Sequence, residues 1–253
     1  MKLDYSFYHV PIAHRGLHNA AKGCPENSVE AIINALNNGY GIEIDIQMSS
    51  DRKAIVFHDN ELDRLTNYTG LIRDKTSEEL KKISLKGSNN KIPLLKEILD
   101  IVGGKKPLLI EIKDQDGALG SNVGILEQEV CNLLSTYRGP AAVMSFNPHS
   151  LKAYKSYGGQ LPIGLVSDSF KKKDWPMISD YRLALLRGLA FFDKISCDFV
   201  SHDFRNLEAK AISELRNRGV PILSWTVKSL EDEIIARKKS VNITFEGYMA
   251  KYG

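Results

Sequence analysis

Eight short apolar segments recur along the 253-residue chain and alternate with longer amphipathic segments. The expected strands are residues 10–14, 41–47, 107–112, 141–146, 162–166, 197–201, 220–226 and 242–246. The expected helices between them are residues 28–38, 93–102, 123–136, 148–157, 178–190, 206–218 and 229–238. This α/β alternation favours a parallel sheet, and eight strands indicate a closed (β/α)8 barrel, the TIM-barrel fold. A doubly wound open sheet is the alternative, but no G-x-G-x-x-G sequence follows the first strand.

The length and composition fit one large domain. Barrels of this kind typically have about 250 residues. The hydrophobic share of 43% is enough for a core, and the charged share of 26% argues against disorder. We therefore expect residues 1–253 to form a single domain. An insertion after the second strand, at about 59–92, is too long for an ordinary loop. We expect it to follow a hairpin strand, AIVFHD (54–59), and to fold over the barrel mouth.

Charge, hydropathy and cysteine content exclude several classes of protein. The formal net charge is +3 with acidic and basic residues mixed, which does not predict nucleic-acid binding. No apolar run of about eighteen residues occurs, and the N-terminus lacks the apolar core of a signal peptide, so we expect a cytoplasmic protein without a membrane span. Three widely spaced cysteines indicate neither a disulfide framework nor a zinc site. The short segment after the last strand leaves part of the barrel wall to the N-terminal segment or to a second subunit of a homo-oligomer.

Two expected strands carry charged residues with a spacing of two. Glu43 and Asp45 lie in GIEIDIQ, and Glu111 and Lys113 lie in LLIEIK. Side chains at i and i+2 on a strand point to the same side. A buried pair of like charges is unfavourable unless a cation or protons neutralise it. Carboxylate oxygens suit a hard divalent cation such as Mg²⁺ or Ca²⁺, and Mn²⁺ fits the same ligands. The alternative is that these carboxylates pair with arginine or lysine on neighbouring strands.

The active site of a closed α/β barrel lies at the carboxyl ends of its strands. Charged and aromatic side chains stand at this end of five expected strands, and a histidine follows the hairpin strand: His14, Arg15, Glu43, Asp45, His58, Glu111, Lys113, Phe146 and Trp225. Phosphodiester hydrolysis requires neutralised phosphoryl oxygens, an activated nucleophile and a protonated leaving group. Together these side chains and a divalent cation can supply all three.

The order of the short motifs narrows the function. The series is HRG (14–16), PEN (25–27), EID (43–45), FHD (57–59), LLIEIK (108–113), SFNP (145–148) and WTV (225–227), and FEGY (245–248) closes it. In this order the motifs resemble the glycerophosphodiester phosphodiesterase family over nearly the whole chain. The combination of HRG, E-x-D and HD is specific, whereas SFNP and WTV add modest weight. The resemblance implies a metal-dependent hydrolase that cleaves glycerophosphodiesters to glycerol 3-phosphate and an alcohol.

The resemblance also implies a role for each matching residue. One divalent cation is held by the acids at Glu43, Asp45 and Glu111. The general acid and base are the histidines at His14 and His58, and the phosphate contacts are Arg15 and Lys113.

The residue chemistry is compatible with these roles. Arg15 can contact a phosphate in bidentate geometry. Neutral and charged imidazole coexist near neutral pH, so one histidine can act as base and the other as acid. We favour His14 as the base and His58 as the acid, with the reverse order as the alternative. Direct attack by water and a cyclic phosphate intermediate are both compatible with the sequence.

Five residues around these groups have supporting or alternative roles. Trp225 and Phe146 can form an apolar wall against the glycerol carbons or simply belong to the core. Glu26 can ligate or orient groups near the metal or serve the structure of its loop, and Asn27 is expected to brace that loop by hydrogen bonds. Asp59 can orient His58 from outside the reacting centre.

Other functions fit parts of this pattern. A non-catalytic barrel that binds a phosphorylated ligand is one, and an isomerase or aldolase with a Schiff base at Lys113 is another. Lys113 beside carboxylates tends to stay protonated, which argues against a nucleophilic amine. A lysophospholipase-D-like or sphingomyelinase-D-like enzyme would need an apolar rim for its lipid substrate. The insertion is mostly polar, so a small glycerophosphodiester is favoured, with the alcohol headgroup unspecified.

Overall fold

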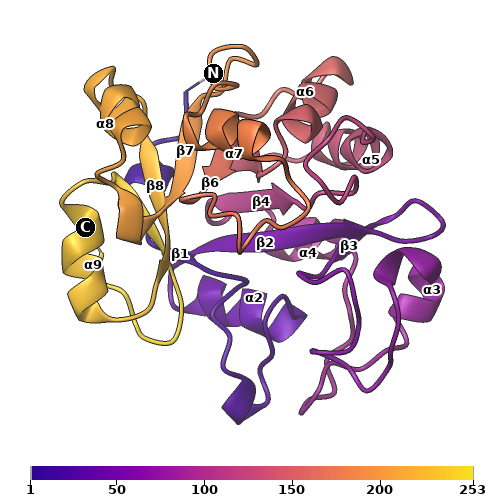
Figure 1. Cartoon of the computed structure of the whole chain (residues 1–253). Coiled ribbons are helices and arrows are strands. Elements are labelled where there is room, and N and C mark those ends of the chain that lie inside the picture. The colour runs from indigo at the N-terminus through magenta and orange to yellow at the C-terminus, as the bar shows by residue number, and fades with distance from the viewer. Residues whose placement is uncertain (1, 253) are drawn as a thin grey trace.

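A closed barrel of parallel strands forms the centre of the computed structural model, which describes residues 2–252 (Figure 1). The strands are β1 (Ile12–Ala13), β2 (Gly41–Met48), β3 (Ala54–Val56), β4 (Leu108–Ile112), β5 (Ala141–Ser145), β6 (Ile163–Ser167), β7 (Phe199–Asp203), β8 (Ile222–Val227) and β9 (Asn242–Phe245). Parallel pairing runs from β2 through β4 to β9, and β1 pairs with both β9 and β2. Eight strands therefore close the barrel, which confirms the predicted (β/α)8 fold.

Seven helices follow the segments that the apolar pattern predicted. They are α2 (Val29–Asn37), α4 (Leu95–Val102), α5 (Ile125–Leu134), α6 (Pro148–Ser156), α7 (Asp180–Arg187), α8 (Lys210–Asn217) and α9 (Leu230–Arg237). The shorter elements are α1 (Ser6–His9), α3 (Ser77–Leu80) and the 3-10 helices η1 (Ala20–Lys22), η2 (Ile72–Asp74) and η3 (Phe204–Asn206). Most predicted bounds extend a few residues beyond the observed helices, as expected where helix ends are set by local hydrogen bonds rather than by apolar periodicity.

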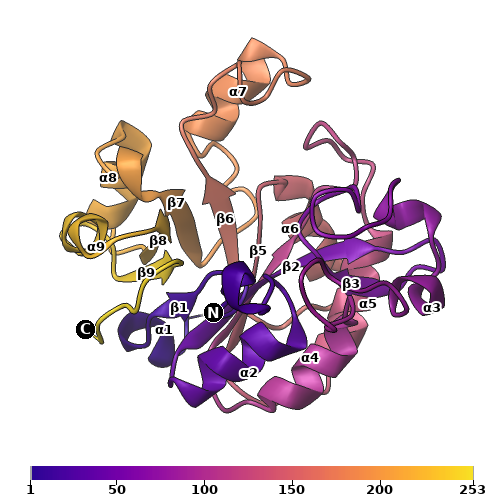
Figure 2. The same ribbon diagram turned by 90° about the horizontal axis from the view of Figure 1, so that it is seen from below.

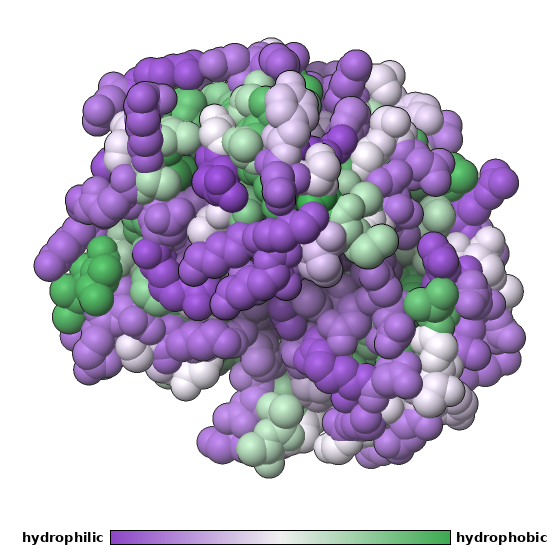
Figure 3. Space-filling model, viewed as in Figure 1, coloured by the Kyte–Doolittle hydropathy of each residue, from purple (hydrophilic) through white to green (hydrophobic). Residues whose placement is uncertain are grey.

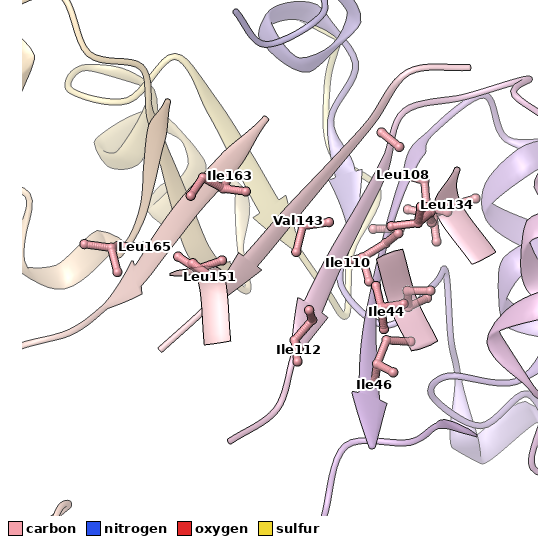
Figure 4. Close-up of a cluster of buried hydrophobic side chains, with 14 of the residues drawn as sticks. Ile44, Ile46, Leu108, Ile110, Ile112, Leu134, Val143, Leu151, Ile163 and Leu165 are labelled. Carbon is pink, nitrogen blue, oxygen red and sulfur yellow. The ribbon is translucent and has the colours of Figure 1, made fainter. Parts of the chain in front are cut away.

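Successive side chains of each strand point alternately outward, to the core between the barrel and the helices, and inward, to the barrel interior. Outward side chains such as Ile44, Ile110 and Val143 pack in one cluster with helix residues such as Leu134 and Leu151 (Figure 4). The residues between them along β2 and β4 face the interior instead, because successive side chains of a strand point to opposite sides. The isoleucines of GIEID therefore attach β2 to the helices while its two acids point into the barrel.

A cluster of apolar side chains around Phe7, here called the plug, fills the barrel interior at the amino-terminal end of the strands. Phe7 of α1 is fully buried and packs with inward residues of the strands, among them Ile12, Leu109 and Phe199. Asn242 of β9 donates hydrogen bonds to the backbone oxygens of Phe7 and Val10, at 2.9 and 2.7 Å. The N-terminal segment thus closes the amino-terminal end of the barrel, and the polar side chains are left at the opposite end.

Replacement of Phe7 by alanine is expected to lower the free energy of unfolding by about 3–5 kcal/mol, because a buried aromatic ring is lost and a cavity remains. Tyr5, which is 75% exposed, is the matched control, and Tyr5→Ala is expected to change stability by no more than about 0.5 kcal/mol. Urea unfolding measures both values. Equal stabilities of the two variants would show that the plug does not support the barrel.

The C-terminal tail covers the wall beyond β9, which the sequence had assigned to the N-terminal segment or to a second subunit. Tyr40 donates a hydrogen bond from its hydroxyl to the Ala250 oxygen at 2.8 Å, and its ring stacks on Tyr252 with centroids 5.7 Å apart. Arg237 of α9 donates to the Lys251 oxygen at 2.7 Å. The tail therefore occupies the side of the barrel where β1, β2 and β9 meet, whereas the N-terminal segment lies at the bottom.

The segment between β2 and α4 forms a unit with its own small core. Strand β3 pairs antiparallel with the end of β2, as the hairpin prediction requires. Buried side chains that include Phe57, Leu62, Ile72 and Leu80 pack together beneath the polar surface of the segment. This core fixes the loops that carry His58 toward the barrel mouth. Within residues 2–252, no helix combines the length and apolarity needed to cross a membrane.

Candidate active site

Three buried carboxylates stand side by side at the carboxyl end of the barrel. Asp45 of β2 lies in register with Glu111 of β4, and Glu43 precedes Asp45 on the same face. The three residues are 1–7% exposed, and one oxygen from each side chain lies within 4.8 Å of the others. The spacing of two along β2 and the parallel register of β2 and β4 together create this cluster.

Two cations balance part of this negative charge. Lys113 Nζ lies 2.8 Å from Glu111 Oε1 and 3.3 Å from Asp45 Oδ1, while Arg15 Nε lies 3.3 Å from Asp45 Oδ2. Burial opposes ionisation of Asp45, but Lys113, His58 and Arg15 together hold its pKa below the ordinary value. Burial, Asp45 and Glu111 raise the pKa of Glu43 well above its usual range. With all three acids ionised, the three carboxylates and two cations leave one negative charge in excess, which either a proton on Glu43 or a further cation can neutralise.

His14 is held by a carboxylate at the end of β9. Its Nδ1 lies 2.5 Å from Glu246 Oε2, and Lys228 Nζ lies 2.6 Å from the other oxygen of Glu246. Hydrogen bonds from His14 and His18 lower the pKa of Glu246 despite its partial burial. An ionised carboxylate only accepts hydrogen bonds, so Nδ1 carries the proton and Nε2 is the nitrogen with the free lone pair. Burial lowers the pKa of His14, which favours the neutral imidazole.

His58 is held by a second carboxylate. Its Nδ1 lies 2.6 Å from Asp59 Oδ1. Asp59 also accepts hydrogen bonds from Arg64, which in turn donates to Glu26. Hydrogen bonds from His58 and Arg64 outweigh the burial of Asp59 and lower its pKa. Each of the two histidines therefore has a carboxylate at Nδ1, as the sequence suggested for Asp59.

The HRG and PEN segments bring the backbone close to the acids. Arg15 has a left-handed backbone (φ +55°), and its N–H donates to Glu43 Oε2 at 3.0 Å. Asn27, also left-handed (φ +57°) and buried, donates from Nδ2 to Asp45 Oδ2 at 2.9 Å. A Cβ at Gly16 would lie 2.8–2.9 Å from Ala31 of α2, so only glycine fits there. Sparsely populated backbone conformations of this kind are maintained where the surrounding contacts fix them.

A small cavity of about 80 Å³ opens onto these groups. Phe146 and Trp225 line it on the apolar side, with ring centroids 5.7 Å apart in an edge-to-face arrangement. Trp225 Nε1 donates to the Ser201 oxygen at 3.0 Å, which fixes the orientation of the indole. The cavity thus combines a charged floor with an aromatic wall, as expected for a ligand that has a phosphate and a carbon skeleton.

Nearly all side chains selected from the sequence meet at this cavity. Those that line it are His14, Arg15, Glu43, Asp45, His58, Glu111, Lys113, Phe146 and Trp225. Glu26, Asn27 and Asp59 lie behind them and contact Arg15, Asp45 and His58, respectively.

Sequence reasoning gave no role to Glu246 or Arg64. Glu246 directly follows the last strand, so its place at the carboxyl end of β9 was a usable signal. Arg64 lies in an irregular part of the insertion, where no periodicity predicts the direction of a side chain. Only the tertiary structure reveals its partners.

Comparison with known proteins identifies a single enzyme family for this chain. The family model described as the glycerophosphoryl diester phosphodiesterase family matches residues 14–244. The chain belongs to this family. The glycerophosphodiester phosphodiesterase of Caldanaerobacter subterraneus is 30% identical over 230 residues, which cover 87% of this chain and 86% of that protein. Family members are phosphoric diester hydrolases, so the predicted family and enzyme class are confirmed.

Solved structures of glycerophosphodiester phosphodiesterases share the fold. A phosphodiesterase of Oleispira antarctica, solved with its product sn-glycerol-3-phosphate, superposes with a TM-score of 0.77 at 21% identity, over 96% of this chain and 94% of that one. The enzyme of Thermotoga maritima superposes with a TM-score of 0.69 at 24% identity, over 94% of both chains. These likenesses support the closed barrel as the family architecture.

Proposed function

We propose that this family member hydrolyses glycerophosphodiesters to glycerol 3-phosphate and an alcohol, with the help of one divalent cation. The observation that carries the proposal is the buried cluster of Glu43, Asp45 and Glu111, in a cavity that His14 and His58 also line. The names of the relatives and the product bound to the Oleispira antarctica enzyme support glycerophosphodiesters as the substrate class. We also propose that residues 1–253 act as one domain, with the insertion at about 59–92 as part of its site.

The donor set fits Mg²⁺ or Ca²⁺, and also Mn²⁺. Glu43, Asp45 and Glu111 would hold the ion, because three carboxylate oxygens in close proximity suit a hard cation. Burial, together with repulsion from Asp45 and Glu111, raises the pKa of Glu43, and a bound cation would relieve both effects. When bound, the cation would supply positive charge for the phosphoryl oxygens during hydrolysis.

The two histidines are suited to proton transfer. Glu246 fixes the Nδ1–H tautomer of His14, which leaves Nε2 as a base that can accept a proton from the nucleophile. His58, oriented by Asp59, is then the acid that protonates the leaving alkoxide. Arg15 and Lys113 carry fixed positive charge toward the phosphate. Burial alone would lower the pKa of Lys113, but Glu111 and Asp45 raise it, so the amine stays protonated and a Schiff-base role is disfavoured.

A small diester is favoured over a lipid. Phe146 and Trp225 offer a wall of limited size for the glycerol carbons. The face of the molecule in Figure 3, which includes α7 and the insertion in the orientation of Figure 1, is mainly hydrophilic, with apolar residues in separate patches. A long acyl chain would need a continuous apolar surface beside the site.

Release of glycerol 3-phosphate from glycerophosphocholine and glycerophosphoethanolamine tests the proposal. Assays contain EDTA or added Mg²⁺, Ca²⁺ or Mn²⁺, with lysophosphatidylcholine as the lipid comparison. We expect metal-dependent release from at least one small diester. Turnover of the lipid alone would transfer the assignment to a lysophospholipase-D-like enzyme. No turnover by folded protein with any metal would contradict the proposal and favour a binding role.

Glu246→Gln is expected to lower turnover of glycerophosphocholine by about 10–100-fold, because an uncharged amide stabilises the required imidazole tautomer and its protonated form less well. The exposed Glu231, at the start of α9, provides the control Glu231→Gln, whose turnover should match the wild type. Steady-state kinetics across pH measures both variants. Wild-type turnover by Glu246→Gln would show that His14 does not depend on this carboxylate.

A further inference from the structure

Arg64 joins two acids that come from separate parts of the chain. Its Nε and one terminal nitrogen donate to the two oxygens of Asp59, at 2.6 and 2.8 Å. Its two terminal nitrogens donate to the two oxygens of Glu26, at 2.9 and 2.8 Å. Both contacts are bidentate, which is the strongest and most directional way in which arginine binds carboxylates. One guanidinium thus connects the PEN loop with the segment after β3.

Each of these acids also holds a residue at the edge of the cavity. Asp59 Oδ1 lies 2.6 Å from His58 Nδ1, and Glu26 Oε1 accepts a hydrogen bond from Arg15 at 2.6 Å. The contacts therefore form one continuous path from His58 through Asp59, Arg64 and Glu26 to Arg15. After His58 the path alternates two negative side chains, Asp59 and Glu26, with two positive ones, Arg64 and Arg15.

The insertion anchors the backbone of Arg64 but leaves its side chain at the surface of the mouth. Leu62 and Leu65, on either side of it, pack in the core of the insertion. Lys86 Nζ donates to the backbone oxygens of Asp63 and Arg64, at 2.5 and 3.1 Å. The Arg64 side chain is 46% exposed, so the core of the insertion does not depend on it.

We propose that Arg64 is a positioning residue through which the insertion holds His58 and Arg15 in place across the barrel mouth. His58 and Arg15 both lie on loops, outside the rigid strands. Without Arg64, Asp59 and Glu26 can each turn toward solvent. The positions of His58 and Arg15 are then no longer fixed relative to each other. A displacement of about 1 Å in a catalytic group costs up to about a hundredfold in rate. The inference rests on the proposed phosphodiesterase function.

Kinetics of Arg64→Ala with glycerophosphocholine test this role. We expect kcat/KM to fall by roughly 30–100-fold while the thermal unfolding transition stays close to that of the wild type. Arg64→Lys should restore only a small part, because an ammonium cannot make two bidentate contacts. Added guanidinium at millimolar concentration should restore Arg64→Ala several-fold, whereas urea, which has the same shape and no charge, should not. Arg73→Ala, an exposed arginine on the same insertion, is the control and should resemble the wild type with or without guanidinium.

A second variant, outside the insertion, tests the same path without a risk that the insertion fails to fold. Glu26→Gln breaks the path outside the insertion, and the double variant with Arg64→Ala should lose no more than the worse of the two single variants. Additive losses, or full activity of Arg64→Ala, would overturn the positioning role. Absence of turnover by the wild type would instead contradict the proposed function, so the two failures are distinguishable.

Discussion

Glu43→Gln is expected to lower metal-dependent release of glycerol 3-phosphate by roughly a thousandfold, because one of the three proposed carboxylate ligands loses its charge. Several kcal/mol of transition-state stabilisation come from a catalytic cation, and each factor of ten in rate corresponds to about 1.4 kcal/mol. Kinetics with glycerophosphocholine at saturating Mg²⁺ or Ca²⁺ measure this loss. The side chain is buried and nearly isosteric with glutamine, so the fold should be unaffected.

Thermal unfolding gives a second readout of Glu43→Gln that does not depend on turnover. A cation at about 100 times its Kd should stabilise the wild type by about 2.7 kcal/mol, and the same concentration should stabilise the variant much less. In EDTA the variant should be at least as stable as the wild type, because the repulsion with Asp45 and Glu111 is reduced. Glu78→Gln, at a side chain 73% exposed on α3, is the matched control. Unchanged metal stabilisation in Glu43→Gln would contradict the proposed ligand.

His14→Ala is expected to lower kcat by about 10²–10⁴-fold, the usual contribution of a general base. Glu246 fixes the tautomer in which Nε2 of His14 is free to accept a proton, and burial favours the neutral imidazole. Metal binding should persist, since the three carboxylates are intact. Kinetics and metal-dependent unfolding together separate loss of the base from loss of the cation.

His9→Ala serves as the control for His14→Ala, because His9 is exposed on α1 at the other end of the barrel. A pH–rate profile adds a further comparison, since the acidic limb of the wild-type profile should disappear or shift when the base is removed. If His14→Ala retains more than a tenth of the wild-type kcat, another group accepts the proton. The same experiment on His58→Ala then decides which histidine is the base.

The fold was largely predictable because the apolar periodicity of each strand and helix can be read from residues that are close together in the sequence. Isoleucines at alternate positions of GIEIDIQ predict a strand whose apolar face is buried, and the tertiary structure buries that face against helices. Strand and helix ends were less accurate: β7 begins at Phe199 rather than 197, and α8 begins at Lys210 rather than 206. Ends depend on which hydrogen bonds neighbouring segments complete, and apolar periodicity carries little of that information. The projecting position of α7 in Figure 2 likewise has no counterpart in the sequence pattern.

Most of the site was predictable for a similar reason. Strand order and the rule that active sites lie at the carboxyl ends of barrel strands bring Glu43, Asp45 and Glu111 together without knowledge of the packing. The HRG and FHD motifs supplied His14 and His58 through their resemblance to the family. Residues on loops outside these motifs were not found in this way.

The sequence by itself determined the closed α/β barrel, the family and the set of charged residues, because strand alternation and motif order are properties of neighbouring residues. The sequence also suggested Asp59, its direct neighbour, as the partner of His58. Only the tertiary structure showed that Glu246, at the far end of the chain, holds His14. It also decided that Arg64 spans Glu26 and Asp59. The physical reason is that a hydrogen bond forms between groups that packing brings together, and packing joins β1 to β9 and the insertion to the PEN loop across the whole length of the chain.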